Sequence, residues 1–149
     1  MLIKRLTESP RLRLVVLFWA MALHSFVIGL ILIFHPADMI GYFGYKSIHE
    51  QFFPVQGGVF HILMAVLYFL TAAQWMHLKC LVYFSLIVKS TAVVFLLSYY
   101  AFVDHITILI VLGFCDGTMA VLIALTAKSL KNEMIKAMVT VPGEAPGNP

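Results

Sequence analysis

The sequence CLVYFSLIVKSTAVVFLLSYY, residues 80–100, and the sequence ITILIVLGFCDGTMAVLIALTA, residues 106–127, decide the fold of this chain. Each is a continuous apolar run close to the ~20 residues that an α-helix needs to cross the ~30 Å hydrocarbon core of a bilayer. Each run holds a single charged residue near its middle, Lys89 in the first and Asp116 in the second. A charge at the centre of a spanning helix costs roughly 2.5–3.5 kcal/mol, so it is normally paired or buried within a bundle. The two runs therefore predict neighbouring membrane helices with a polar site between them.

The rest of the chain has the same apolar character. Of its 149 residues, 62% are apolar and only 11% are charged, which leaves too little polar surface to cover a water-soluble globule. Two further apolar windows, 14–34 and 54–73, bring the set to four. Barrel strands are disfavoured because they run ~10 residues with alternating polarity. The sequence predicts an all-α integral membrane protein.

Short connections between the windows predict how the helices are arranged. Residues 74–79 join the second and third windows, and a turn around 100–105 joins the third and fourth. Helices joined in this way are antiparallel neighbours, so we expect an antiparallel four-helix bundle. Ser9 followed by Pro10 is typical of a helix N-cap and first helical position. We divide the chain into an N-terminal segment 1–13, a four-helix domain 14–127 and a tail 128–149.

Two segments outside the windows carry expectations of their own. The exterior loop 35–53 is rich in aromatic residues, and we expect a short interfacial helix over about 36–43. In the tail, apolar residues recur at helical spacing between 130 and 138 against lysines, which predicts an amphipathic extension. Residues 141–149 are rich in Pro and Gly and are predicted to be disordered.

Basic residues are distributed unequally between the two ends of the predicted bundle. Of the ten Lys and Arg residues, Lys89 lies within a span and Lys46 lies in the exterior loop. The other eight fall on the side of the termini: Lys4, Arg5, Arg11, Arg13, Lys79, Lys128, Lys131 and Lys136. The positive-inside rule places both termini in the cytoplasm of an inner (plasma) membrane protein. The net charge of +3 is thus a topology signal and gives no support to a nucleic-acid partner.

Residue counting places one ionisable group from each predicted helix at a similar depth. Lys89 and Asp116 are equidistant from the middle of the turn between their helices, so an ion pair is geometrically natural. His24 in the first helix and His61 in the second lie close to the same level. We predict an intramembrane polar pocket formed by His24, His61, Lys89 and Asp116.

The faces of three helices predict that these groups point inward. Small and polar residues share a face with each ionisable group, whereas lipid-facing stripes would be Leu, Ile, Val and Phe throughout. The three faces are Gly57, His61, Ala65, Tyr68 and Ala72; Ser85, Lys89, Ala92 and Tyr99; and Gly113, Asp116, Gly117, Ala120 and Ala124. We assign Gln56, Tyr68, Ser85 and Tyr99 as supporting residues of the pocket.

Several interpretations of this polar layer remain open. The Lys89–Asp116 pair is a structural lock that fixes helix register, with the histidines bonded to nearby hydroxyls or carbonyls. Alternatively, the layer is a proton-responsive or ligand-binding pocket, because desolvated lysine, carboxylate and imidazole groups can exchange protons at neutral pH. A sharper form has His24 and His61 ligate a b-type haem from both sides, which would make the protein an electron carrier.

Signals of catalysis and of metal binding are lacking in the sequence. It contains no nucleophile motif, phosphate-binding glycine loop or dinucleotide fingerprint. Cys80 and Cys115 fall at different depths and belong to no CxxC pair. The exterior set of His35, Asp38, His49, Glu50, Asp104 and His105 matches no metal-ligand spacing. We assign no catalytic or metal-binding residue and expect no independent enzymatic activity.

The start of the second helix carries a family resemblance. Pro54 ends the exterior loop, and Gln56–Gly57–Gly58 opens the helix. With the four-span layout from about Leu14 to Lys128, this pattern resembles the small bacterial DoxX-like membrane proteins. Some members of that group look like accessory subunits of quinone-linked sulfur or redox systems, so the resemblance implies a protein partner or a quinone. No site of that family maps onto Phe60–His61 or Lys89–Ser90.

We therefore expect a small inner-membrane protein that acts as an accessory or ligand-binding subunit with a buried polar pocket. Its partners would be the lipid bilayer and either another membrane protein or further copies of this chain. The alternative is an oligomeric transporter or proton pathway that uses the intramembrane Lys, Asp and His groups, because four helices alone rarely provide two gates. The haem-binding electron carrier is a second alternative.

Overall fold

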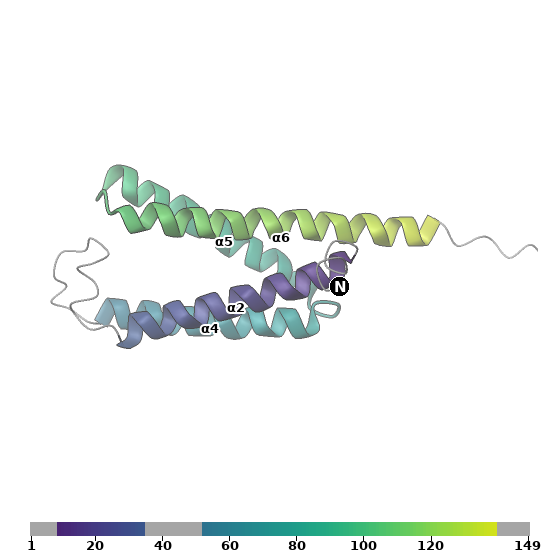
Figure 1. Ribbon diagram of the computed structural model, residues 1–149, viewed down its shortest axis with the longest axis horizontal. Helices are drawn as coiled ribbons and strands as arrows, with labels where there is room; N and C mark the ends of the chain where they lie inside the picture. Colours follow the sequence, from purple (N-terminus) through teal and green to yellow (C-terminus); the bar gives the residue numbers. More distant parts are fainter. Residues whose placement is uncertain (1–8, 35–51, 140–149) are drawn as a thin grey trace, which may run out of the picture.

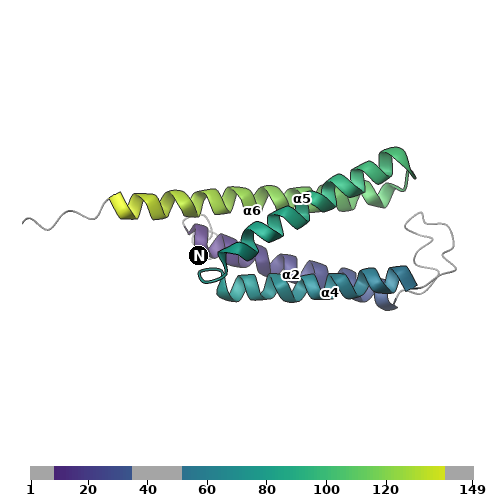
Figure 2. The ribbon, with the colours of Figure 1, turned by 180° about the vertical axis from the view of Figure 1, so that it is seen from behind.

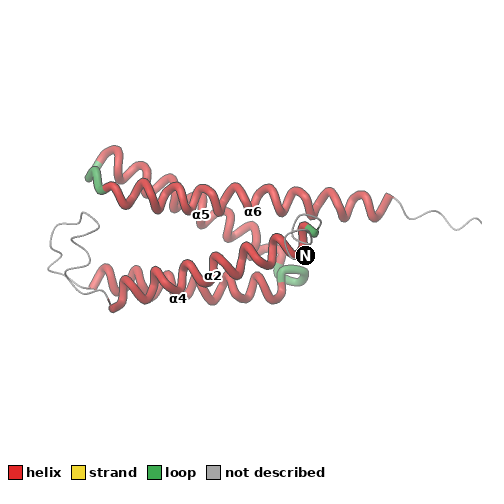
Figure 3. Tube along the Cα trace, viewed as in Figure 1, coloured by secondary structure: helices red, strands yellow, loops and turns green. Residues whose placement is uncertain are grey.

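The computed structural model of the protein describes residues 9–34 and 52–139. These residues form four helices, α2 (Pro10–Phe34), α4 (Phe52–Gln74), α5 (Lys79–Phe102) and α6 (Thr107–Val139) (Figure 1). All four are long and apolar enough to cross a membrane. Figure 3 shows that the connections between α4 and α5 and between α5 and α6 are short loops. The predicted all-helical class and the four candidate spans are confirmed.

The first helix begins where the capping signal predicts. The hydroxyl oxygen of Ser9 accepts a hydrogen bond from the backbone N–H of Leu12 at 3.4 Å, and its carbonyl accepts one from Arg13 at 3.1 Å. Pro10, which has no N–H to lose, takes the first helical position. The helix therefore starts before the apolar window at 14, because capping sets the start of a helix whereas apolarity marks only its lipid-exposed part.

The last helix is longer than its apolar window. α6 runs without a break from Thr107 to Val139, past the domain boundary that the sequence analysis set after residue 127. No Gly or Pro occurs between Ala127 and Val139, and Ala, Leu, Lys, Glu and Met are good helix formers. The amphipathic segment thus continues the spanning helix. The expected interfacial helix at 36–43 and the expected disordered end at 141–149 lie outside the described residues.

The four helices are arranged as two pairs. α2 lies along α4, and α5 lies along α6 (Figures 1 and 2). The pairs converge at the end that carries the start of α2 and the turn before α5, and they diverge toward the turn between α5 and α6. α2 contacts α6, and α4 contacts α5 less extensively. Side chains from all four helices form the buried core: Leu14, Phe18, Met21, Ala22, Tyr68, Ala72, Val82, Ile123 and Leu130.

Two glycines bring the backbones of α2 and α4 into contact. A Cβ atom added at Gly29 would lie 2.9 Å from the carbonyl oxygen of Gly58, and one added at Gly58 would lie 2.8 Å from that of Gly29. Such small-residue contacts replace the hydrophobic driving force that membrane helices lack. The sequence analysis placed Gly57 on the face of His61 and Tyr68, and a Cβ at Gly57 would meet only Leu32 at 3.8 Å. The contact falls one residue later, a rotation of about 100° around the helix.

Large apolar side chains cover the outer surfaces of the helices. Leu23, Ile87, Phe95 and Phe114 are each more than 60% exposed, as a lipid-facing surface requires. The two cysteines, Cys80 and Cys115, are free and exposed, so they form no pair with each other. A polar site of this protein is therefore expected in its interior.

Candidate functional site

An ion pair links Lys89 and Asp116, which lie near the middle of their candidate spans. The ammonium nitrogen Nζ of Lys89 on α5 donates to the carboxylate oxygen Oδ1 of Asp116 on α6. The two side chains are only 5% and 15% exposed. Since a lone charge would be costly in a bilayer, each residue removes the penalty of burying the other. The pair sets α5 and α6 in register at this level.

An aromatic side chain from the other helix pair faces the same ammonium group. Lys89 Nζ lies 5.7 Å from the centroid of the Tyr68 ring on α4, within the range of a cation–π interaction. Tyr68 is 1% exposed, and its ring centroid is 6.1 Å from that of Phe18 on α2. Phe18, Tyr68, Lys89 and Asp116 thus form a chain of contacts with one member from each helix.

The buried hydroxyl groups nearby are bonded within their own helices. Ser85, one turn before Lys89 and fully buried, donates from Oγ to the carbonyl of Leu81 at 2.7 Å. Thr71, fully buried in α4, donates from Oγ1 to the carbonyl of Leu67 at 2.8 Å. Bonds of this kind satisfy a hydroxyl that lies in an apolar environment. Neither hydroxyl hydrogen-bonds a histidine.

The imidazoles of His24 on α2 and His61 on α4 lie within electrostatic range of the ion pair. Both side chains are partly buried, and both interact electrostatically with Lys89 and Asp116. Neither imidazole hydrogen-bonds or ion-pairs with another described residue. No fully buried side-chain nitrogen or oxygen in the described part of the chain lacks a partner, so the unbonded imidazole nitrogens are accessible. We call Tyr68, Lys89, Asp116, His24 and His61 the polar centre.

Two of the expected supporting residues lie away from the polar centre. Gln56 is exposed near the start of α4. Tyr99 is 37% exposed, and its ring packs on Phe95 with a centroid distance of 6.0 Å. Ten residues separate Tyr99 from Lys89, which is about 2.8 turns, so Tyr99 is rotated about 80° away from the face of Lys89. The same rotation carries Ala124, eight residues after Asp116, to the exposed face of α6.

Sequence reasoning missed two residues that position the polar centre. Phe18 supports the Tyr68 ring, and Gly29 sets the spacing between α2 and α4. Both belong to a buried stripe of α2 at helical spacing, which consists of Leu14, Phe18, Met21, Ala22, Ser25 and Gly29. The signal was present in the sequence as a face of that helix on which large residues, Leu14 to Met21, are followed by small ones, Ala22 to Gly29. His24 lies beside this stripe.

A haem held between His24 and His61 would have to lie between two helices whose backbones are in close contact. Ligation from both sides places the two imidazoles on opposite faces of the macrocycle. The helices that carry them touch through Gly29 and Gly58, within about two turns of either histidine. A macrocycle at this level would have to push α2 and α4 apart. Among the described residues there is also no group of three or more His, Cys, Asp or Glu side chains that could hold a metal ion.

No family model, curated protein or solved structure matches this chain. These comparisons bear neither on the DoxX-like layout nor on a ligand.

Proposed function

We propose that this chain is a small multi-pass inner-membrane protein that serves as an accessory or ligand-binding subunit, with the polar centre as its binding site. One observation carries the proposal. Two imidazoles within the candidate spans have accessible nitrogens and no hydrogen-bond partner among the described residues, although both interact electrostatically with a buried ion pair. Polar groups at membrane depth are normally satisfied within the protein or by a bound molecule. A bound ligand supplies the hydrogen-bond partners that the two imidazoles lack among the described residues.

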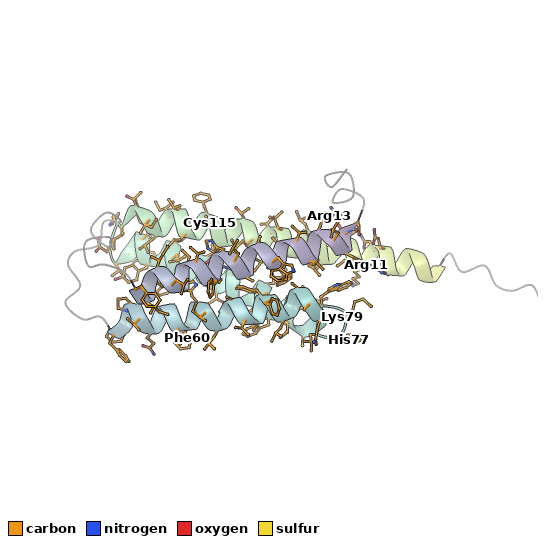
Figure 4. The ribbon with its side chains drawn as sticks, turned by 60° about the horizontal axis from the view of Figure 1, so that its bottom comes forward. Arg11, Arg13, Phe60, His77, Lys79 and Cys115 are labelled. Carbon is orange, nitrogen blue, oxygen red and sulfur yellow. The ribbon has the colours of Figure 1, made fainter. Side chains whose placement is uncertain are left out.

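The proposed topology is an antiparallel bundle with both termini in the cytoplasm. Arg11, Arg13, His77 and Lys79 lie at the end of the protein beyond which α6 projects (Figure 4). Lys79 and Lys131 line one cavity there. Asp104, in the turn between α5 and α6, belongs to the opposite end. Basic residues gathered at one end support a cytoplasmic location of that end.

The chemistry of the polar centre suggests the class of ligand. Lys89 and Asp116 neutralise each other, so the centre has no excess charge to attract a free ion. The two imidazoles offer both donors and acceptors. A membrane-soluble molecule with a polar head that carries carbonyl or hydroxyl oxygens matches these groups. A quinone is the member of this class that the DoxX-like resemblance suggests.

Native mass spectrometry of the protein released from bilayer nanodiscs tests the proposal. We expect a retained small molecule in the wild-type protein, with its mass identified after solvent extraction. Its affinity should fall about five- to thirtyfold in His24→Phe and His61→Phe, with a matching loss of occupancy, since each lost hydrogen bond in an apolar site is worth about 1–2 kcal/mol. His105→Phe is the matched control, because His105 lies in the exposed turn and makes a ring contact with Tyr100 that phenylalanine preserves.

Equal occupancy in all four proteins, or an empty wild-type protein, would contradict the proposal and leave the structural lock as the account of the polar centre. Folding of each variant is checked by its circular dichroism and its unfolding midpoint in the same detergent. A variant that loses the ligand but keeps the wild-type midpoint separates binding from stability.

A second candidate function is a proton pathway built from several copies of the chain. The presence of ionisable groups on all four helices, two of them with accessible imidazole nitrogens, favours it. The exchange Lys89→Asp with Asp116→Lys separates the two functions. A pathway needs each group in its own place and loses proton flux into liposomes, whereas a fixed pair beside a binding site keeps both its fold and its ligand.

A further inference from the structure

A second site lies at the basic end of the protein, away from the polar centre. α2, α5, α6 and the turn before α5 enclose a cavity of about 280 Å³ there. Its floor is apolar and includes Leu14, Val82 and Leu130, which are 1%, 6% and 5% exposed. The cavity therefore offers an apolar surface for a chain or ring, lined by residues of three helices.

The rim of this cavity is positively charged. Lys79 and Lys131 line it from α5 and α6, and both are exposed. Neither lysine has a carboxylate within 4.0 Å among the described residues, where the ion pair of Lys89 and Asp116 is the salt bridge that forms. Two ammonium groups that face one cavity without an acidic partner predict an anionic ligand.

The backbone adds positive charge at the same place. α5 begins at Lys79, and its N-cap residue Leu78 makes no side-chain capping bond. The first turn of α5 also lacks an acidic residue. The first amide groups of a helix carry partial positive charge and bind phosphate readily when no side chain occupies them. The lysines and the start of α5 thus place positive charge on the same cavity.

The aromatic lining sets the depth of the cavity. Trp75 and Tyr83 line it, and Tyr83 is 62% exposed. Trp and Tyr are enriched at the level of the lipid headgroups, where an apolar ring meets a polar boundary. Arg11 and Arg13 lie at the same end of the protein (Figure 4). The cavity therefore combines an apolar floor, an aromatic edge and a basic rim at headgroup depth.

We propose that this cavity binds an anionic phospholipid, with the phosphate between Lys79, Lys131 and the start of α5 and an acyl chain on the apolar floor. Basic pockets between spanning helices at the cytoplasmic face are suited to anionic headgroups. The proposal is independent of the polar centre, because it uses none of its residues. The bound lipid fixes the end of the protein where all four helices converge.

The test uses the full chain in nanodiscs of phosphatidylcholine and phosphatidylglycerol in equal amounts. Native mass spectrometry after release counts the phosphatidylglycerol and phosphatidylcholine molecules that each protein retains. The wild-type protein should retain phosphatidylglycerol selectively. Selectivity should fall roughly fivefold for Lys79→Gln or Lys131→Gln and roughly thirtyfold for both together.

Two controls test whether the effect is specific to the lysines that line the cavity. Lys128→Gln removes an exposed lysine of α6, the helix that also carries Lys131. Lys128 does not line the cavity, so this variant should retain the wild-type selectivity. Lys79→Arg with Lys131→Arg keeps both charges and should also retain it. Equal losses in Lys128→Gln and in the cavity variants would overturn the proposal, because the effect would then be general surface charge.

A further measurement distinguishes the binding of a lipid from the binding of free phosphate. The detergent-solubilised protein is given inorganic phosphate at millimolar concentration without lipid, and its unfolding temperature is measured. The proposal expects no stabilisation by phosphate alone and stabilisation by phosphatidylglycerol that is lost in the double glutamine variant. Equal stabilisation by inorganic phosphate would overturn the assignment of a lipid.

Discussion

The ammonium nitrogen of Lys89 lies 5.7 Å from the centroid of the Tyr68 ring, so the charge carried by α5 faces an aromatic ring of α4. α4 and α5 share few other contacts, and each packs mainly on a different helix. Because Asp116 of α6 pairs with the same ammonium group, Lys89 joins the α2–α4 pair to the α5–α6 pair at mid-span. This single side chain is expected to couple the stability of the two halves.

Removal of one partner from the Lys89–Asp116 pair should cost more than removal of both. Lys89→Met and Asp116→Asn each leave a buried polar or charged group without its partner, at a cost of up to about 3–5 kcal/mol in free energy of unfolding. The double variant should recover a large part of that loss, because no unpaired charge remains. Unfolding in mixed micelles with increasing SDS measures all four proteins. Strictly additive losses would show that the two residues do not act as a pair.

The ring of Tyr68 should matter more than its hydroxyl group. Tyr68→Phe keeps the aromatic face toward Lys89 and should retain wild-type stability within about 0.5 kcal/mol, whereas Tyr68→Leu should lose about 1–2 kcal/mol. In a Lys89→Met background the difference between Phe and Leu should shrink, since the cation is gone. An unchanged difference in that background would assign the effect to packing against Phe18 alone.

The contact of α2 with α4 should tolerate no side chain at Gly58. Gly58→Ala places a Cβ 2.8 Å from the carbonyl oxygen of Gly29, and the forced separation should cost about 1–3 kcal/mol. Gly57→Ala is the matched control, because its Cβ has 3.8 Å to the nearest side-chain atom and alanine favours the helix. The unfolding midpoints of the two variants check this difference, and a control as unstable as Gly58→Ala would contradict the observed contact.

The proposed orientation makes a labelling prediction. Cys80 is exposed at the basic end of α5 and should react with a membrane-impermeant maleimide only after the cells are opened. A cysteine introduced as Asp104→Cys, in a Cys80→Ser background, should react in intact cells, because the turn between α5 and α6 would face outward. Cys115 should stay unlabelled in the bilayer, since a membrane-impermeant reagent does not reach the hydrocarbon core. The reverse pattern would invert the topology.

Much of the fold was predictable because membrane spans are a strong signal of length and apolarity. The four helices and the pairing of Lys89 with Asp116 follow from continuous apolar runs and from residue counting along helices of fixed rise. The start of α2 at Pro10 follows from the Ser9–Pro10 cap. These features depend on local rules that tertiary contacts do not override.

Rotation about the helix axes was less predictable. A small error in the assumed helical spacing accumulates over more than about two turns. For this reason the sequence analysis assigned Tyr99 and Ala124 to the interior, whereas both are exposed. The contact of Gly58 with Gly29 joins two helices and is non-local, so the sequence pattern of either helix alone does not predict it. The divergence of the two helix pairs likewise depends on packing between helices, which periodicity does not encode.

The most direct test of the central claim is histidine-selective ¹⁵N NMR of the protein in nanodiscs, before and after bound small molecules are stripped with mild detergent and the protein is returned to fresh lipid. His24 and His61 signals are assigned by their loss in His24→Phe and His61→Phe. The account predicts that both sets of imidazole nitrogen signals move on stripping and return when the extract is added back. Signals that stay fixed while the protein remains folded would contradict a ligand at the polar centre.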